Sequence, residues 1–206
     1  MNLTNLGDLI DRTKNPDAIA LIDCLHWNAP REFTHGEIDR LVKACARGLQ
    51  RHGLKRGDSV AILSANRAEF LIAYFAIMRA GMVAVPVNHK FPRDTIEFVL
   101  SDSAARLAFC DHERRASVPD GIPVVQFDAP EGWQAFLDPG DFETVQPAPG
   151  EAAMILYTSG STGRPKGVPL SHAGHLWAVQ TRLRGGPYVK DRLIVAAPLF
   201  HMNGLG

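Results

Sequence analysis

The sequence has little of what defines several large classes of protein. Its three cysteines are widely spaced in 206 residues and include no C-x-x-C pair, which supports neither a disulfide framework nor a zinc site. Free thiols are typical of a reducing compartment. The longest uncharged apolar run, residues 70–78, is far shorter than the roughly 20 residues that a bilayer span needs. We therefore expect no transmembrane segment.

An excess of charge of either sign is also missing. Lysine plus arginine number 22 and aspartate plus glutamate number 22, which argues against a nucleic-acid partner because such binding depends on a cationic surplus. The amino terminus has no basic stretch followed by an apolar one, so no secretory signal is expected and a cytoplasmic location is predicted. Hydrophobic residues at 46% and charged residues at 21% are typical of a folded globular chain.

What the chain does contain is an alternation of strand-like and helix-like segments. Thr34 and Glu37 have the spacing of a capping box, which predicts a helix that ends near Gly53. Further helices are expected over residues 68–80, 92–100 and 171–181, and strands over 60–63, 83–87, 107–110, 124–127, 152–157 and 193–197. This order predicts an α/β fold with a largely parallel sheet that is flanked by helices.

Residues 157–168, with the sequence YTSGSTGRPKGV, carry the most chemical information. Hydroxyl groups and glycines alternate in this loop, and Lys166 adds a positive charge. The glycines permit positive φ and close approach to a ligand, and successive N–H groups in such a turn can bind an anion. The hydroxyl residues are Thr158, Ser159, Ser161 and Thr162, and the glycines are Gly160, Gly163 and Gly167. The loop therefore offers what a polyphosphate requires.

The spacing differs from that of a Walker phosphate loop, in which the lysine directly follows a glycine and opens a helix. Here Arg164 and Pro165 separate Gly163 from Lys166, and the following residues Gly-Val-Pro-Leu favour extended backbone. A Ser-x-x-Lys acyl-enzyme motif is also excluded, because Arg164 stands three residues after Ser161. The loop is predicted to join two strands.

Together these residues resemble the phosphate-binding signature of the adenylate-forming (AMP-binding) superfamily, which includes acyl-CoA synthetases, nonribosomal adenylation domains and luciferases. Four other segments follow the order and spacing of the same family. They are residues 33–38 (FTHGEI), 53–62 (GLKRGDSVAI), 80–88 (AGMVAVPVN) and 197–204 (APLFHMNG). The resemblance covers the chain from about Phe33 to its end and is least informative over residues 111–150.

The resemblance implies activation of a carboxylic acid by ATP, followed by transfer of the acyl group to a thiol, commonly that of coenzyme A. It implies ATP, Mg²⁺ and coenzyme A as the small-molecule partners besides the acid. Residues Thr158 to Gly163 would then surround the β- and γ-phosphates, and Lys166 would neutralise charge on the departing pyrophosphate. Thr158 would also place its hydroxyl on the magnesium ion.

His201 is the second catalytic candidate that the resemblance implies, on the side of the acyl substrate, where it would either gate the acyl site or help orient the carboxylate. Adenylation domains for α-amino acids typically have Phe-Asp where this chain has Phe200 and His201, so the resemblance favours an acyl- or aryl-CoA ligase. His172 and His175 stand three apart, but without a further ligand they indicate an ordinary helix rather than a metal site.

The later segments of such enzymes, which hold adenine and ribose, have no counterpart before Gly206. We therefore expect residues 1–206 to form an incomplete amino-terminal AMP-binding domain, with the carboxy-terminal remainder of the enzyme absent and the isolated 206 residues inactive. A second possibility is a non-catalytic module that binds phosphate or a partner protein. A stop codon after Gly206 would favour the module, and an in-frame Tyr-Gly-x-Thr-Glu segment would favour the ligase.

Overall fold

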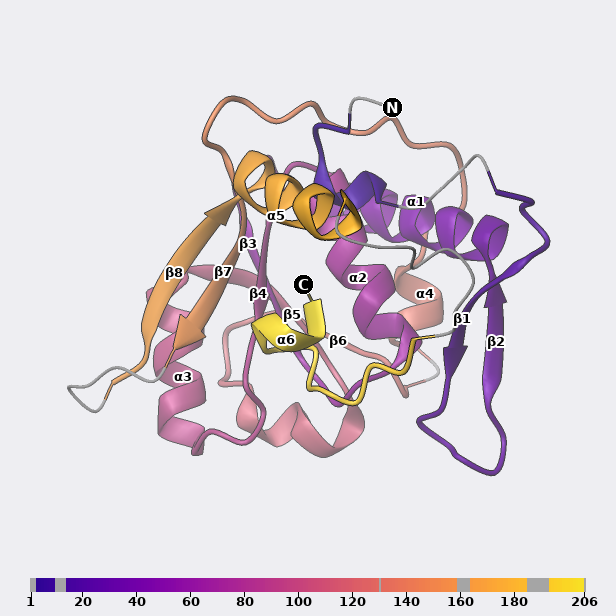
Figure 1. Cartoon of the computed structure of the whole chain (residues 1–206). Coiled ribbons are helices and arrows are strands. Elements are labelled where there is room, and N and C mark those ends of the chain that lie inside the picture. The colour runs from indigo at the N-terminus through magenta and orange to yellow at the C-terminus, as the bar shows by residue number, and fades with distance from the viewer. Residues whose placement is uncertain (1–2, 10–13, 130, 159–163, 185–192, 206) are drawn as a thin grey trace.

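The computed structural model describes residues 3–9, 14–129, 131–158, 164–184 and 193–205. Six strands form one sheet in the order β6-β5-β3-β4-β7-β8, shown in Figure 1. All neighbours pair in parallel except β7 and β8, which form an antiparallel pair at one edge. The strands are β3 (Ser59–Leu63), β4 (Val83–Pro86), β5 (Ala105–Cys110), β6 (Val124–Gln126), β7 (Ala152–Thr158) and β8 (Lys166–Ser171). The predicted α/β class is confirmed.

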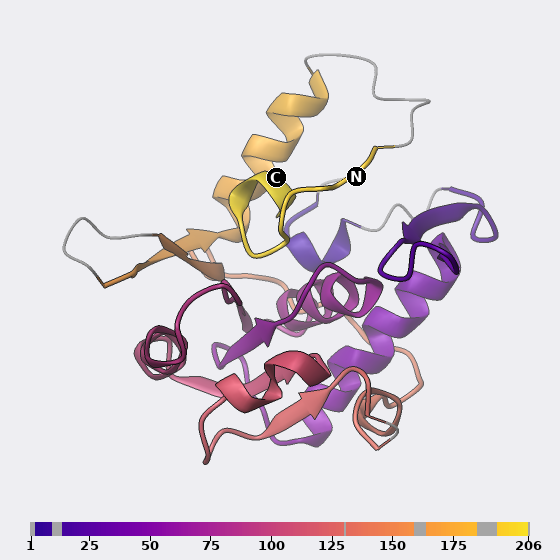
Figure 2. The same ribbon diagram turned by 90° about the horizontal axis from the view of Figure 1, so that it is seen from below.

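Helices cover both faces of this sheet, as Figure 2 shows from below. The helices are α1 (His35–Arg51), α2 (Ala68–Arg79), α3 (Arg93–Asp102), α4 (Trp133–Phe136), α5 (His172–Arg184) and α6 (Met202–Leu205), and two short 3₁₀ helices are η1 (Leu6–Asp8) and η2 (His112–Ser117). α2 connects β3 to β4, and α3 connects β4 back to β5 on the other side of β3. Right-handed crossovers in opposite directions place the two helices on opposite faces.

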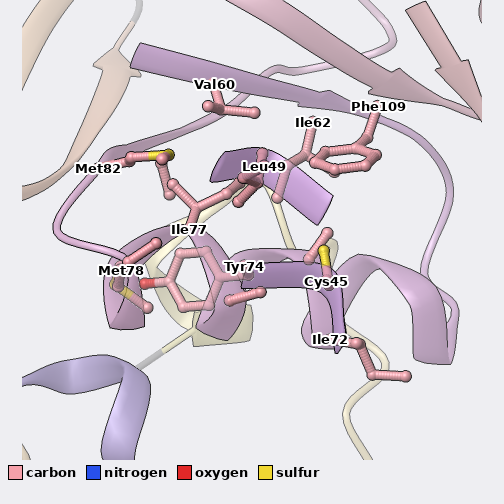
Figure 3. Close-up of a cluster of buried hydrophobic side chains, with 14 of the residues drawn as sticks. Cys45, Leu49, Val60, Ile62, Ile72, Tyr74, Ile77, Met78, Met82 and Phe109 are labelled. Atoms are coloured by element: carbon pink, nitrogen blue, oxygen red, sulfur yellow. The ribbon is translucent and has the colours of Figure 1, made fainter. Parts of the chain in front are cut away.

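Alternate residues of β3 show the two faces directly. Val60 and Ile62 belong to the larger hydrophobic cluster, which contains residues of α1, α2 and α4, and Figure 3 shows both of them above α2. Ala61 and Leu63 belong to the second cluster, which contains residues of α3. The strand is buried on both faces, as is typical of a central parallel strand.

Helix α2 is the most enclosed element of the larger cluster. It buries ten of its twelve residues, which confirms that an all-round apolar helix lies inside the fold. Ile72, Tyr74 and Ile77 are labelled in Figure 3 among these side chains. Full burial of one such side chain stabilises the fold by about 1.5–3 kcal/mol.

The predicted boundaries of α1 rest on real capping interactions. The Glu37 N–H donates to Thr34 Oγ1 at 3.1 Å, and Glu37 Oε2 accepts from the Thr34 N–H at 2.9 Å. Gly53, just beyond the helix, has a φ of +80°, the left-handed conformation that ends many helices. Both ends of this helix are therefore encoded locally.

One sequence prediction needs correction, and two features of the fold were not predicted. Residues 193–197 form no strand, because no neighbouring strand within the described part of the chain pairs with them, and Ile194 is 92% exposed. An antiparallel hairpin of β1 (Ile19–Asp23) and β2 (Arg31–Thr34) was not predicted from the sequence. Cys24, in the loop of this hairpin, is exposed, whereas the other two cysteines are buried.

An ionic network joins this hairpin to the sheet. Arg31 donates to both carboxylate oxygens of Glu69 at 2.7 and 2.9 Å, and Arg67 Nε donates to the same carboxylate at 2.7 Å. Arg67 also donates to Asp128 at 2.6 Å. Burial alone would raise the pKa of Glu69, but hydrogen bonds from Arg31 and Arg67 outweigh it and lower this pKa to about 2. Glu69 is therefore a charged, partnered group at the start of α2.

Candidate functional site

Several loops meet where the parallel strands end. β3 is parallel to β4 and β5, and β7 is parallel to β4, so the carboxyl ends of all four strands lie at one edge of the sheet. In open α/β sheets, ligands bind outside the carboxyl ends of the strands. The segment after β7 is the predicted phosphate loop. The topology therefore places this loop where the fold class binds its ligands.

The two ends of the phosphate loop are fixed by strand pairing. Thr158 ends β7 and Lys166 begins β8, and these two residues are directly paired in the antiparallel ladder. Both are exposed. The loop thus joins two strands, as predicted, and no helix follows Lys166 directly. Ser159, Gly160, Ser161, Thr162 and Gly163 lie outside the described residues.

Gly167 corrects one detail of the sequence prediction. Its φ is not positive, so left-handed backbone is not why glycine stands there. A Cβ at this position would lie 3.0 Å from Cζ of Tyr157 and 3.2 Å from its hydroxyl oxygen. Tyr157 is its direct cross-strand partner. The absent side chain therefore makes room for the tyrosine ring.

His201 lies in the turn that precedes α6. Its backbone N–H donates to the Pro198 carbonyl at 3.0 Å, and its side chain is exposed. The residues before it are anchored: Leu199 is buried in the larger hydrophobic cluster. The His201 backbone is thus held at a defined place beside the sheet, although not at the end of a strand.

Asn66 is a residue of this edge that the sequence did not single out. It lies between β3 and α2, and its side-chain Nδ2 donates to the Ala197 carbonyl at 2.9 Å. Its Oδ1 accepts from the Leu199 N–H, also at 2.9 Å. Asn66 therefore connects the carboxyl end of β3 to the segment that carries His201.

The loop that presents Asn66 is itself held by the end of β5. Oδ2 of the buried Asp111 accepts from Ser64 Oγ at 3.1 Å and from the Ala65 N–H at 2.9 Å. The same oxygen accepts from Arg114 Nη1 at 2.8 Å. Ser64 and Asp111 each directly follow an apolar strand, so a polar residue at that position is the sequence signal for this contact.

His89, which follows the carboxyl end of β4, contacts the segment that carries His201. Its ring meets the Phe200 ring edge-on, with 5.0 Å between the ring centroids. Within the described part of the chain its buried Nδ1 has no hydrogen-bond partner. Burial and the nearby Arg114 guanidinium lower the pKa of His89, which favours a neutral ring at pH 7. A neutral histidine therefore packs against the residue that precedes His201.

His172, the first residue of α5, has a structural role. The Leu6 N–H donates to Nδ1 of His172 at 3.1 Å, and burial lowers the pKa of His172. This nitrogen is therefore an unprotonated acceptor that ties η1 to α5. Across the described ranges no three His, Cys, Asp or Glu side chains form a metal-binding group. Thr158 is exposed, which is compatible with a magnesium ligand. Its role toward Mg²⁺ stays a prediction.

Two cavities have volumes of about 200 and 230 Å³, and Gly204, three residues after His201, lines the first. The first is lined by Leu6, Tyr74, Met78 and His175 among others, and the second by Leu21, His35 and Ile38 among others. Neither is lined by Thr158, Lys166 or His201.

Among the described helices none is long and apolar enough to cross a membrane.

The fold is an α/β domain of the type that binds ligands beyond the carboxyl ends of its parallel strands, and sequence comparison identifies the family. The family described as "AMP-binding enzyme" matches residues 11–206. The chain therefore belongs to the AMP-binding enzyme family, as the sequence motifs predicted.

Three curated relatives illustrate the range of the family. Malpibaldin synthetase of Mortierella alpina is 37% identical over 78% of this chain and 3% of its own length. Feruloyl-CoA synthase of an Amycolatopsis species is 35% identical over 84% of this chain and 35% of its own length. 2-Succinylbenzoate–CoA ligase of Bacillus velezensis is 35% identical over 96% of this chain and 40% of its own length. The chain thus spans two-fifths or less of these relatives.

Solved structures agree with this assignment. An ATP-bound RpMatB–BxBclM chimera superposes with a TM-score of 0.83 and 28% identity over 100% of this chain and 42% of that one. The o-succinylbenzoate coenzyme A synthetase of Bacillus subtilis, in complex with ATP and magnesium, gives a TM-score of 0.73 and 29% identity over 85% of this chain and 47% of that one. The fold is that of the amino-terminal part of adenylate-forming CoA ligases.

Proposed function

We propose that this chain is the amino-terminal part of an AMP-forming acid–thiol ligase. In the first reaction, a carboxylate oxygen attacks the α-phosphorus of ATP, the bond to the β-phosphate oxygen breaks, and pyrophosphate leaves. In the second, a thiol that loses its proton attacks the acyl carbon, and AMP departs with the electrons of the carbon–oxygen bond. The products are a thioester, AMP and pyrophosphate.

The observation that carries this proposal is the convergence of two motifs at one edge of the sheet. The Thr158–Lys166 strand pair opens beyond β7, and Asn66, beyond the parallel β3, binds the segment before His201. An acid and ATP that react in line need their sites side by side. The family match and the CoA-ligase relatives support the same reaction class.

On this proposal the protein contributes charge and position rather than a covalent nucleophile. Residues Thr158 to Gly163 surround the β- and γ-phosphates, and Lys166 neutralises the leaving pyrophosphate. Thr158 would supply one neutral oxygen to Mg²⁺, whose other ligands would come from the phosphates and from an acidic group elsewhere. The bound ion would neutralise phosphate charge. The exposed hydroxyl of Thr158 at the mouth of the loop is compatible with this use.

His201 acts on the acyl side, where it helps orient the carboxylate. The attacking group already carries a negative charge, so no general base is needed. With His201 in place of an aspartate, no carboxylate is available there to pair with a substrate ammonium, which favours acyl or aryl acids over α-amino acids. Coenzyme A is the proposed acceptor. We place the enzyme in the cytoplasm, since its free thiols favour a reducing compartment.

The alternative is a non-catalytic module that keeps the phosphate loop. The test is to read the coding sequence beyond Gly206 and to measure acid-dependent ATP–pyrophosphate exchange by the protein that the complete reading frame encodes, here called the full-length ligase. A panel of aliphatic, aromatic and amino acids would identify the substrate class. A stop codon after Gly206, or an absence of acid-dependent exchange across the panel, would overturn the ligase proposal.

A further inference from the structure

Helix α3 contacts strand β7 and the residues that lead into strand β8. On the β7 side, the Tyr157 hydroxyl donates to Asp102 Oδ2 at 2.7 Å. On the β8 side, the guanidinium carbon of Arg164 lies 5.3 Å from the centre of the Phe98 ring, a cation–π distance. Figure 1 shows α3 beside the ends of these two strands. One helix therefore meets a side chain on each side of the loop.

The helix is a fixed support for these contacts. Ile96, Val99 and Leu100 are buried in the second hydrophobic cluster, against the face of the sheet formed by alternate residues of β3 and β5. Phe98 is half-buried beside the same cluster, and Asp102 at the end of the helix is exposed. The apolar face thus anchors α3 to the sheet, and its other residues are free to hold the hairpin.

The geometry of the strand pair directs Tyr157 toward α3. The tyrosine lies opposite Gly167, where a side chain would meet the ring at about 3.0 Å. Tyr157 immediately precedes Thr158, and Arg164 stands two residues before Lys166. A small displacement of either contact would therefore be passed directly to the two residues that the proposed function places on the phosphates.

We propose that Tyr157, Asp102 and Phe98 are positioning residues for ATP, which hold the two strands so that Thr158 and Lys166 face the phosphates together. This inference rests on the proposed function. None of the three residues is required to touch the nucleotide. Their contacts reduce the ordering that binding must otherwise impose on the hairpin, which improves affinity for ATP and pyrophosphate without altering the acyl side.

The test uses the full-length ligase and separates ATP from the acid. Tyr157→Phe and Asp102→Ala each remove the same hydrogen bond, and each should raise KM for ATP by about two- to tenfold while KM for the acid stays within about twofold. The double variant should resemble Tyr157→Phe, because that variant already lacks the hydrogen bond that Asp102→Ala removes. Asp102→Asn keeps a carbonyl acceptor for the tyrosine hydroxyl and should restore a nearly normal KM for ATP.

Tyr74→Phe is the matched control. It also removes one tyrosine hydroxyl, which lies 3.1 Å from Met154 Sδ in the core, four residues before Thr158 on β7 and without a contact to α3. This variant should reduce stability without changing KM for ATP. Backbone hydrogen exchange at residues 157–158, 164 and 166–168 provides a second measurement. It should quicken in Tyr157→Phe and Asp102→Ala and stay unchanged in Asp102→Asn and Tyr74→Phe.

The outcomes separate the two proposals. Acid-dependent exchange in the wild type, with KM for ATP unchanged in Tyr157→Phe and Asp102→Ala, overturns the positioning role and leaves the ligase intact. Equal rises in KM for ATP and for the acid overturn it as well, because they indicate a general loss of structure. If the wild type shows no ATP–pyrophosphate exchange, the ligase proposal fails. The positioning of ATP then fails with it, even if hydrogen exchange shows that the β7–β8 hairpin is protected by these contacts.

Discussion

The side-chain oxygen of Asn66 accepts a hydrogen bond from the Leu199 N–H at 2.9 Å, across 133 residues of sequence. Asn66 Nδ2 also donates to the Ala197 carbonyl. One side-chain amide thus bonds to a backbone N–H and to a backbone carbonyl of the segment before His201. Asp111 in turn fixes the loop that presents Asn66. The position of His201 thus depends on hydrogen bonds of Asn66 and Asp111, which follow the carboxyl ends of β3 and β5.

Replacing this amide should therefore affect the acid more than ATP. In the full-length ligase, Asn66→Ala removes two hydrogen bonds, each worth about 1 kcal/mol, so kcat/KM for the acid should fall about 10- to 30-fold. KM for ATP should change by less than about twofold. Asn28→Ala, an exposed asparagine in the β1–β2 loop, is the control and should be neutral. Equal losses for ATP and acid would contradict the assignment.

Lys166 offers a test of the phosphate side. It is exposed at the start of β8, so its replacement should leave stability nearly unchanged. Loss of one preorganised electrostatic contact with the leaving pyrophosphate costs about 100- to 1,000-fold in rate, and Lys166→Ala should lower ATP–pyrophosphate exchange by that factor. Lys55→Ala, at an exposed turn before β3, is the control and should keep the wild-type rate of ATP–pyrophosphate exchange. Near wild-type exchange by Lys166→Ala would refute the role.

His201 should show the opposite selectivity. His201→Ala in the full-length ligase should impair acid-dependent turnover about 10- to 100-fold while ATP affinity stays within about twofold, because the proposed role is confined to orienting the carboxylate. Steady-state titration of each substrate and ATP binding by calorimetry measure the two effects separately. His26→Ala, exposed in the β1–β2 loop, is the control. Lost ATP binding with normal handling of the acid would be incompatible with this role.

Much of the parallel sheet could be predicted because its signals are local. The apolar run of β3, the all-round apolar α2 and the capping box of α1 all lie within short windows of sequence. The β1–β2 hairpin could not, because its strands are short and largely exposed and their pairing depends on contacts with α1 and α2. Residues 193–197 were assigned wrongly, since an apolar run becomes a strand only where another strand pairs with it.

The candidate site likewise contains residues that could be predicted from the sequence and residues that could not. The phosphate loop was predicted by residue type, because hydroxyls, glycines and a lysine must stand together in the sequence to surround a phosphate chain. Asn66, His89 and Asp111 were not, because their contacts join segments that meet only in the folded sheet. Nothing in their local sequence distinguishes them from other polar residues that follow strands.

The ionic network around Glu69 leads to a prediction about stability and pH. The pKa of Glu69 is lowered to about 2 in the folded protein, below the ordinary 4.5, so the unfolded chain binds this proton more readily. The resulting stabilisation is fully present above about pH 4.5 and is lost as the pH falls from about 4.5 to about 2. Arg31 is 42% exposed, which weakens its contribution, and the net effect should be about 2 kcal/mol.

Glu69→Gln should therefore unfold more easily than the wild type at pH 6, with the difference in free energy of unfolding shrinking toward zero near pH 2. Urea denaturation between pH 6 and pH 2 measures this convergence. Glu97→Gln is the matched control, since Glu97 pairs with Arg93 on the exposed face of α3, where such a pair contributes about 0.3–0.5 kcal/mol. Its free energy of unfolding should stay within about 0.5 kcal/mol of the wild type at every pH. A constant difference between Glu69→Gln and the wild type across this range would show that Glu69 stabilises the fold through packing rather than through its charge.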